Sequence, residues 1–207
     1  QMCIRDSTTP GRFATLGPSA GWESFYSYGG SRRPNGPVAR SRAHSDTLNY
    51  LSNIADRGVY IIHGDADDNV PISEGRNMYQ AAMMHTLDIE MHEQPGAGHW
   101  WDGEAAAGAD CVDWPPLFQF MKRRQLDPWE SDFVFRSPSA SYSSKHSFIE
   151  LLSSISPDED LVVEANSIGT RLEVTTQNVR SMRFDHMGLG EAGIEELNVN
   201  GVAVELT

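Results

Sequence analysis

The chain has 207 residues, of which 39% are hydrophobic and 22% charged, and its formal net charge at pH 7 is −13. This composition fits a globular protein with one sizeable core, or with one core and a small appended domain. The acidic balance excludes nucleic acid and anionic membrane surfaces as partners, because both need a basic footprint. No run of about 18 apolar residues is present, so we expect no membrane span.

Both ends of the chain are interpreted as non-native. The lead QMCIRDS, residues 1–7, resembles translated sequencing-adapter read-through, and the chain stops at Thr207 directly after an apparent hairpin strand. With the lead set aside, Cys111 is the single cysteine and cannot form an internal disulfide. No histidine or cation neighbours it in the sequence to activate the thiol, so we interpret Cys111 as a small buried apolar residue.

Strand-like and helix-like segments alternate over residues 8–127. The clearest is the strand at 57–68, in which four consecutive apolar residues, Val59 to Ile62, are stopped by Gly64 and a group of aspartates. Alternation at this spacing predicts βαβ units and a parallel sheet with flanking helices. Before the strand at 57–68 we expect a strand at 13–17, a loop at 22–37 and a helical segment at 46–55. After it we expect a helix at 71–86, a strand followed by a glycine-rich loop at 87–101, and a helix at 113–125. Ser73 and Asp113 are the expected N-caps of the two helices.

Residues 128–207 differ in texture, because their predicted elements are all strands. The run VNGVAV carries the Asn-Gly signal of a tight hairpin between alternating residues. We therefore expect a separate all-β, sandwich-like domain over residues 128–207, behind a partial α/β domain over residues 8–127.

Two candidate catalytic residues follow neighbouring strands of the predicted sheet. Asp67 lies in IIHGDADDNVP, and His99 follows 32 residues later in PGAGHWW, about one strand-helix-strand crossover away. Loops at the carboxyl ends of parallel strands meet at one edge of the sheet, where an aspartate can orient and stabilise a histidine. Aspartate before histidine is the order of the α/β-hydrolases. Asp65 and Asp68 are close rivals to Asp67 for the acid.

These motifs carry a family resemblance. HGDADDNVPIS followed by GAGHWWDG resembles the carboxyl half of the catalytic domain of the prolyl oligopeptidase family of serine peptidases. FATLGPSAGWESFYSYGG and CVDWPPLFQFMKRR are similar to pieces of the same domain, and TTQNVRSMRF and NVNGVAVEL to a β-rich region that trails it in bacterial members, so the resemblance spans roughly residues 11–207.

The resemblance implies a serine-type hydrolase, a peptidase acting through an acyl-enzyme, with Asp67 as acid and His99 as base. It implies His63 and Gly64 as structural residues of the strand-end turn, a peptide or ester substrate, and no metal or organic cofactor. Related bacterial proteins are often exported, which favours a periplasmic or secreted location. The oligomeric state stays open.

The nucleophile is not evident. GPSAG matches G-x-S-x-G around Ser19, but only 48 residues separate Ser19 from Asp67, where two strand-helix units of about 30 residues each are expected. Pro18 also constrains the sharp turn that would present the serine. Against the family, this segment corresponds to the strand after the nucleophile's helix. We therefore expect the true nucleophile upstream of Phe13, outside this chain, with Ser19 a weak candidate.

Other interpretations remain. A calcium loop at Asp65, Asp67 and Asn69 fails, because Val70 and Arg76 replace the required Gly and Glu. An esterase or lipase of the same fold is possible, as is a non-catalytic protein whose β domain binds carbohydrate or a partner. Several aromatic residues could line a substrate pocket or pack in the core: Trp22, Phe25, Tyr26, Trp100 and Trp101.

Overall fold

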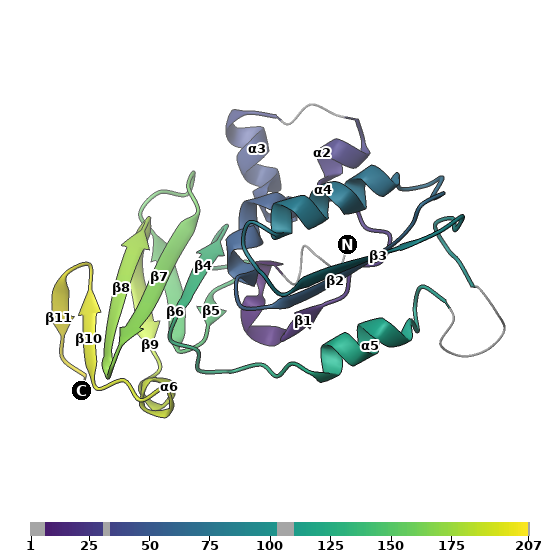
Figure 1. The fold of residues 1–207 in the computed structure, drawn as a ribbon. Coiled ribbons are helices and arrows are strands. Elements are labelled where there is room, and N and C mark those ends of the chain that lie inside the picture. Colours follow the sequence, from purple (N-terminus) through teal and green to yellow (C-terminus); the bar gives the residue numbers. More distant parts are fainter. Residues whose placement is uncertain (1–6, 31–33, 103–109, 207) are drawn as a thin grey trace.

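A three-stranded parallel sheet forms the centre of the first half of the computed structural model, which describes residues 7–30, 34–102 and 110–206 (Figure 1). The strands are β1 (Thr15–Leu16), β2 (Gly58–Gly64) and β3 (Ile89–Gln94), in the order β1-β2-β3. Both pairings are parallel, so the loops that follow β2 and β3 emerge at the same edge of the sheet. The predicted parallel sheet is confirmed.

Strand β2 is buried on both faces, as its continuous apolar run predicts. Val59 and Ile61 pack in one cluster with residues of the 3₁₀ segment η3 (Thr47–Ile54) and of helix α4 (Ile72–Ala82). Tyr60 and Ile62 pack on the opposite face against helix α5 (Pro115–Lys122). In Figure 1, α4 lies above the sheet and α5 below it.

Several local predictions are wrong. The expected loop at 22–37 contains the short helix α2 (Phe25–Tyr28), which Ser24 caps, and the start of α3 (Gly36–Arg42), which runs into the 3₁₀ turn η2 (Ala43–Ser45). The strand expected to start at Leu87 begins only at Ile89, the first residue of β3, and Leu87 is 99% exposed.

Neither predicted helix cap holds. Helix α4 starts after Pro71 and has no side-chain cap, so Ser73 lies inside its first turn. Helix α5 starts after Trp114, and the Asp113 carboxylate instead accepts a hydrogen bond from the backbone N–H of Asp110. Prolines cause both displacements: their restricted φ starts a helix without a side-chain acceptor.

The second half is a two-sheet β domain. Its sheets have the orders β11-β10-β8-β7-β4 and β5-β6-β9, and residues from both enclose one core that includes Phe135, Ile149 and Leu161. The predicted sandwich-like region is confirmed, with two additions: β8 and β10 are parallel, and helix α6 (His186–Glu191) connects β9 to β10. The strands are β4 (Phe133–Ser137), β5 (Lys145–His146), β6 (Ile149–Ser154), β7 (Leu161–Ile168), β8 (Arg171–Gln177), β9 (Val179–Phe184), β10 (Glu196–Val199) and β11 (Val202–Val204).

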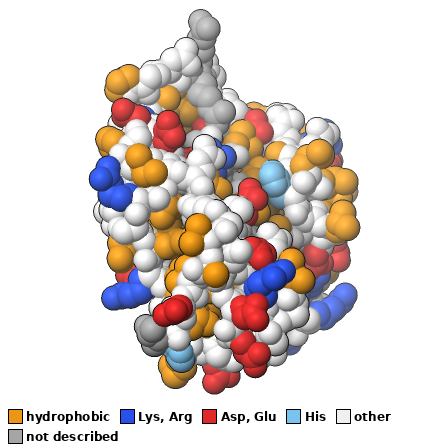
Figure 2. All heavy atoms as spheres, turned by 90° about the vertical axis from the view of Figure 1, so that its left-hand side faces the viewer, with side chains coloured by type: hydrophobic (Ala, Val, Ile, Leu, Met, Phe, Trp, Pro, Cys, Tyr) orange, Lys and Arg blue, Asp and Glu red, His pale blue; other side chains and the backbone are white. Residues whose placement is uncertain are grey.

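The predicted Asn-Gly hairpin joins β10 to β11. Asn200 and Gly201 have φ values of 52° and 81°, the left-handed conformation that such two-residue turns require. The outer face of the β domain carries acidic and basic side chains interspersed with hydrophobic ones (Figure 2). Within the described ranges, no helix is long and apolar enough to cross a membrane.

Polar contacts join the two halves. The Asn53 side chain, on η3, pairs with the backbone of Arg136 on β4: its Nδ2 donates to the carbonyl at 2.8 Å and its Oδ1 accepts from the N–H at 2.7 Å. The same Nδ2 lies 2.7 Å from the carbonyl of Ser7, a buried residue of the expected lead; residues 1–6 lie outside the described part. Asn53 thus acts like one residue of an additional strand beside β4.

Candidate active site

Asp67 lies in the turn between β2 and α4, and its side chain is fully buried. Its Oδ1 accepts hydrogen bonds from the backbone N–H groups of Asn69 and Val70, both at 2.8 Å. Burial by itself raises the pKa of the Asp67 carboxyl, but the hydrogen bonds from Val70, His99 and Asn69 outweigh it and hold the pKa below its ordinary value. The carboxylate is therefore fixed in orientation and ionised at neutral pH.

His99 lies in the loop after β3 and faces the same carboxylate. Its Nδ1 is 2.8 Å from the Oδ2 of Asp67, and its side chain is 19% exposed. A carboxylate can only accept, so Nδ1 carries the proton and Nε2 is left as the basic nitrogen of the neutral ring. A histidine held in this way by a buried aspartate has the geometry of a general base.

The two loops are tied together independently of this pair. Asp65 Oδ1 accepts from the N–H of Gly96 at 2.6 Å, and the N–H of Ala66 donates to the carbonyl of Ala97 at 3.0 Å. Gly64 permits this approach, since a Cβ there would lie 2.3 Å from the Ala97 carbonyl oxygen. Of the rival aspartates, Asp65 thus holds the backbone of the second loop, and Asp68 is exposed in the turn.

Ser19 is not on a strand-to-helix turn. It lies in an extended segment that continues β1 along β2: Ile62 donates to the Pro18 carbonyl at 2.9 Å and accepts from the Ala20 N–H at 2.8 Å. The next described helix, α2, begins only at Phe25. Among the described residues, the Ser19 hydroxyl makes no hydrogen bond to His99.

Aromatic side chains flank the two loops. Trp22 stacks on Tyr28 with ring centroids 4.8 Å apart, and the Tyr28 hydroxyl donates to Asn69 Oδ1 at 3.1 Å. The Trp100 ring is 78% exposed and meets the His99 ring edge-on at 5.5 Å. Trp101 instead packs against Trp114 beneath the sheet. Of the rest of the predicted aromatic set, Phe25 lies against Trp22 and is 42% exposed, whereas Tyr26 lines a separate cavity beside α3.

The sequence interpretation overlooked Glu74. This side chain is buried in the first turn of α4 and accepts hydrogen bonds from the backbone N–H of Glu23 at 3.1 Å and from the Ser27 hydroxyl at 2.6 Å. It thereby fastens α2 beside the Asp67 turn. An acidic residue in the first turn of a predicted helix was the available signal, but its partners come from a segment expected to be loop.

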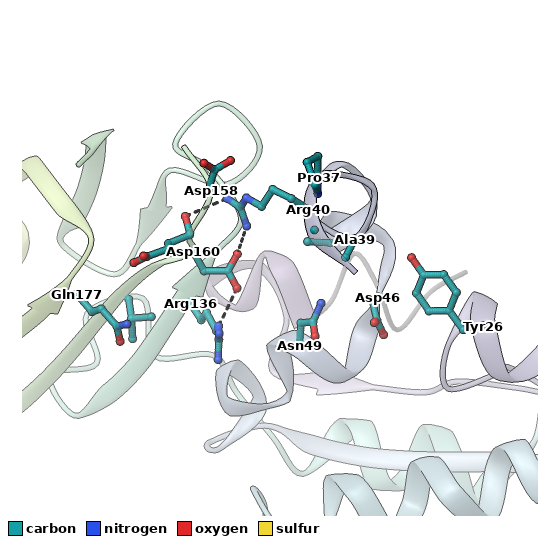
Figure 3. A pocket seen from close by; sticks show the side chains of 14 residues that line it. Tyr26, Pro37, Ala39, Arg40, Asp46, Asn49, Arg136, Asp158, Asp160 and Gln177 are labelled. Carbon is teal, nitrogen blue, oxygen red and sulfur yellow. Dashed lines mark hydrogen bonds and ion pairs between the residues drawn. The ribbon is translucent and has the colours of Figure 1, made fainter. Parts of the chain in front are cut away.

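A cavity of about 730 Å³ lies elsewhere. It opens between α3 and the β domain (Figure 3), and neither Asp67 nor His99 lines it. On its wall, Arg40 binds Asp160 and the carbonyl groups of Pro138, Pro157 and Glu159, while Asp160 also binds Arg136. The Arg40 guanidinium therefore joins the two halves, whereas Arg136 and Asp160 pair within the β domain.

No group of three or more His, Cys, Asp or Glu side chains is arranged to hold a metal ion within residues 7–30, 34–102 and 110–206. Cys111 is free and buried, as expected for a small apolar residue.

The part of the chain that carries Asp67 and His99 is also the part that is similar to a known family. Residues 22–114 match the model of the prolyl oligopeptidase family, which confirms the resemblance over this segment. None of the curated proteins matches the chain. Among solved structures, a PHB depolymerase (S39A) complexed with R3HB trimer is similar at 11% identity with a TM-score of 0.33; the match covers 78% of this chain and 65% of that one, less than two thirds of its length.

Proposed function

Since residues 22–114 carry the match to the prolyl oligopeptidase family, which supports a hydrolase at the level of the family, we propose that this chain supplies the acid and base of a serine hydrolase. One observation carries the proposal: the hydrogen bond of 2.8 Å between His99 Nδ1 and the fully buried side chain of Asp67 at the edge of a parallel sheet. The proposed substrate is a peptide, with an ester as the second choice.

The proposed chemistry is acyl transfer. A serine hydroxyl attacks the substrate carbonyl while His99 Nε2 takes its proton, and the Asp67 carboxylate stabilises the imidazolium that forms. His99 then returns the proton to the leaving group, and the acyl-enzyme is released when water attacks in the same way. No step requires a metal or an organic cofactor.

We propose that the serine is contributed by sequence upstream of Phe13. The family presents its nucleophile on a sharp turn between a strand and a helix, before the acid and the base in the chain. Ser19 follows a strand of two residues and precedes no helix of the required kind. A strand before β1, with its helix, would complete this order and leave Asp67 and His99 in the roles given above.

A fluorophosphonate probe tests the proposal on a chain extended upstream through its first G-x-S-x-G motif. We expect labelling of that serine, its abolition by His99→Ala, and a rate reduced about 10³–10⁴-fold by Asp67→Asn, which disturbs the tautomer of the base. His85→Ala, a change at an exposed histidine, is the matched control and should label normally.

A folded, extended protein that does not label would overturn the proposal. The 207-residue chain alone should show no esterase turnover, and activity that disappears with Ser19→Ala would refute the assignment of the nucleophile.

A further inference from the structure

His63 makes contacts to the Asp67 turn that packing alone does not explain. It is in β2, is fully buried, and its Nε2 lies 2.9 Å from the Val70 carbonyl oxygen and 3.2 Å from Asp67 Oδ2. Both neighbours are acceptors, because Asp67 is ionised at neutral pH. Nε2 must therefore carry a proton, which it donates to the Val70 carbonyl.

The surroundings of the other ring nitrogen, Nδ1, show where His63 carries its proton. Among the described residues, Nδ1 has no hydrogen-bond partner, and Gly75 of α4 approaches so closely that a Cβ there would lie 2.6 Å from it. A proton on Nδ1 would be a buried donor without an acceptor, which is costly. Glu93, which pairs with His63 in the β2–β3 register, is engaged by Arg76 instead. His63 is thus the neutral tautomer protonated at Nε2.

Resting on the proposed function, we infer that His63 is a positioning residue for the catalytic acid: its Nε2–H bonds the Val70 carbonyl and so holds the Asp67 turn in place for His99. The carboxylate receives three hydrogen-bond donors, two backbone N–H groups at Oδ1 and His99 at Oδ2, and His63 Nε2 lies 3.2 Å from the same Oδ2. His63 Nε2–H donates to the Val70 carbonyl and so fixes the turn that supplies one of the backbone N–H groups. A fixed turn restricts rotation of the carboxylate away from His99.

The first test reads the tautomer directly in the 207-residue chain. Long-range ¹H–¹⁵N correlation spectra should show His63 protonated at Nε2 and unprotonated at Nδ1 at neutral pH. A proton on Nδ1, alone or in the imidazolium, would overturn the inference. This measurement needs neither activity nor a variant, so it remains decisive even if every substitution at position 63 unfolds the protein.

The second test compares His63→Leu with His63→Gln, because the Gln amide can place a donor where Nε2 lies and Leu cannot. Carboxyl ¹³C titration should show the pKa of Asp67 rising toward its ordinary value in the Leu variant, because the turn that supplies the Val70 N–H is no longer held, and staying near the parent value in the Gln variant. In the extended protein, kcat should fall about tenfold for Leu with KM unchanged, and Gln should restore most of it.

Equal Asp67 titrations for Leu and Gln would show that His63 only fills space. Failure of the extended parent to react with the probe would remove the proposed function, while the tautomer and the titration would still decide the contact between His63 and the Asp67 turn.

Discussion

The two halves of the chain bury their apolar residues in different ways. Among the residues that the structure describes, the β domain has a core of 13 buried residues that both sheets enclose, whereas the parallel sheet has two thinner layers, of seven and four buried residues, on its opposite faces. Only β2 is buried along its whole length; β1 has two residues, and the side chains of β3 are mostly half-buried. The β domain is therefore the better candidate for independent stability, and the parallel half depends more on its neighbours.

The boundary shows what those neighbours supply. Arg57, just before β2, forms a buried ion pair with Glu130, and Glu130 Oε1 also lies 2.7 Å from His146 Nε2 of the β domain. With the contacts of Asn53 and Arg40, these ion pairs make the interface between the halves a set of hydrogen bonds and ion pairs with fixed geometry. The domain limits at 8–127 and 128–207 remain a prediction, and the stability experiments below bear on them.

The largest expected losses of stability come from truncating one core leucine in each half. Leu161→Ala, in the β-domain core and fully buried, should lower the free energy of unfolding by about 4–5 kcal/mol, at the upper end for such a change. Leu117→Ala, in the thin layer under β2 and 6% exposed, should cost about 2–3 kcal/mol, because the surroundings can collapse into the space. Chemical denaturation followed by circular dichroism measures both. A larger loss at Leu117 would reverse the comparison.

Removing the charge at the boundary should have the next largest effect. Glu130→Gln leaves the nearly buried guanidinium of Arg57 without its counter-ion, and we expect a loss of about 3 kcal/mol at pH 7. The two halves should then unfold in separable steps, which calorimetry would resolve. Arg76→Gln, at an exposed ion pair with Glu93, is the control and should leave the unfolding midpoint nearly unchanged, because solvent screens the pair. A single transition of unchanged midpoint in Glu130→Gln would contradict the coupling.

The same carboxyl predicts a pH dependence. Burial raises the pKa of Glu130, but its bonds to His146 and Arg57 outweigh this and bring the pKa to about 2, from an ordinary 4.5. A lowered pKa in the folded state means that the stabilisation is complete above about pH 4.5 and is lost as the pH falls toward 2. The stability difference between parent and Glu130→Gln should therefore shrink across that range in acid denaturation curves. A difference that is constant from pH 5 to pH 2 would exclude this origin.

The features that the sequence predicts correctly are those whose physical cause lies in residues close together in the chain. Strand β2 was predictable because a short run of four apolar residues stopped by Gly64 and aspartates suits a strand buried on both faces, and the Asn200–Gly201 hairpin because few residues adopt its backbone. The hydrogen bond between Asp67 and His99 follows from the length of one crossover in a parallel sheet. The catalytic role of the pair stays a prediction.

The features that were missed depend on tertiary partners. Helix α2 has only four residues and is held by Glu74, some fifty positions away, so no local periodicity indicates it. The N-caps expected at Ser73 and Asp113 were wrong because nearby prolines set the start of each helix. The donor role of His63 rests on which of its ring nitrogens meets an acceptor, and only the fold decides that.

The smallest predicted effects test whether the stability of the β domain depends on its core rather than on its periphery. Gly201→Ala places a side chain at a φ of 81° in open space, so it should cost about 1 kcal/mol through backbone conformation alone. Gly190→Ala, in α6 and equally free of neighbours, should instead stabilise by about 0.5–1 kcal/mol, because alanine loses less entropy in a helix. Denaturant midpoints of the two variants should move in opposite directions. A loss at Gly201 as large as that at Leu161 would mean that the β10–β11 hairpin, and not the shared core, holds the two sheets together.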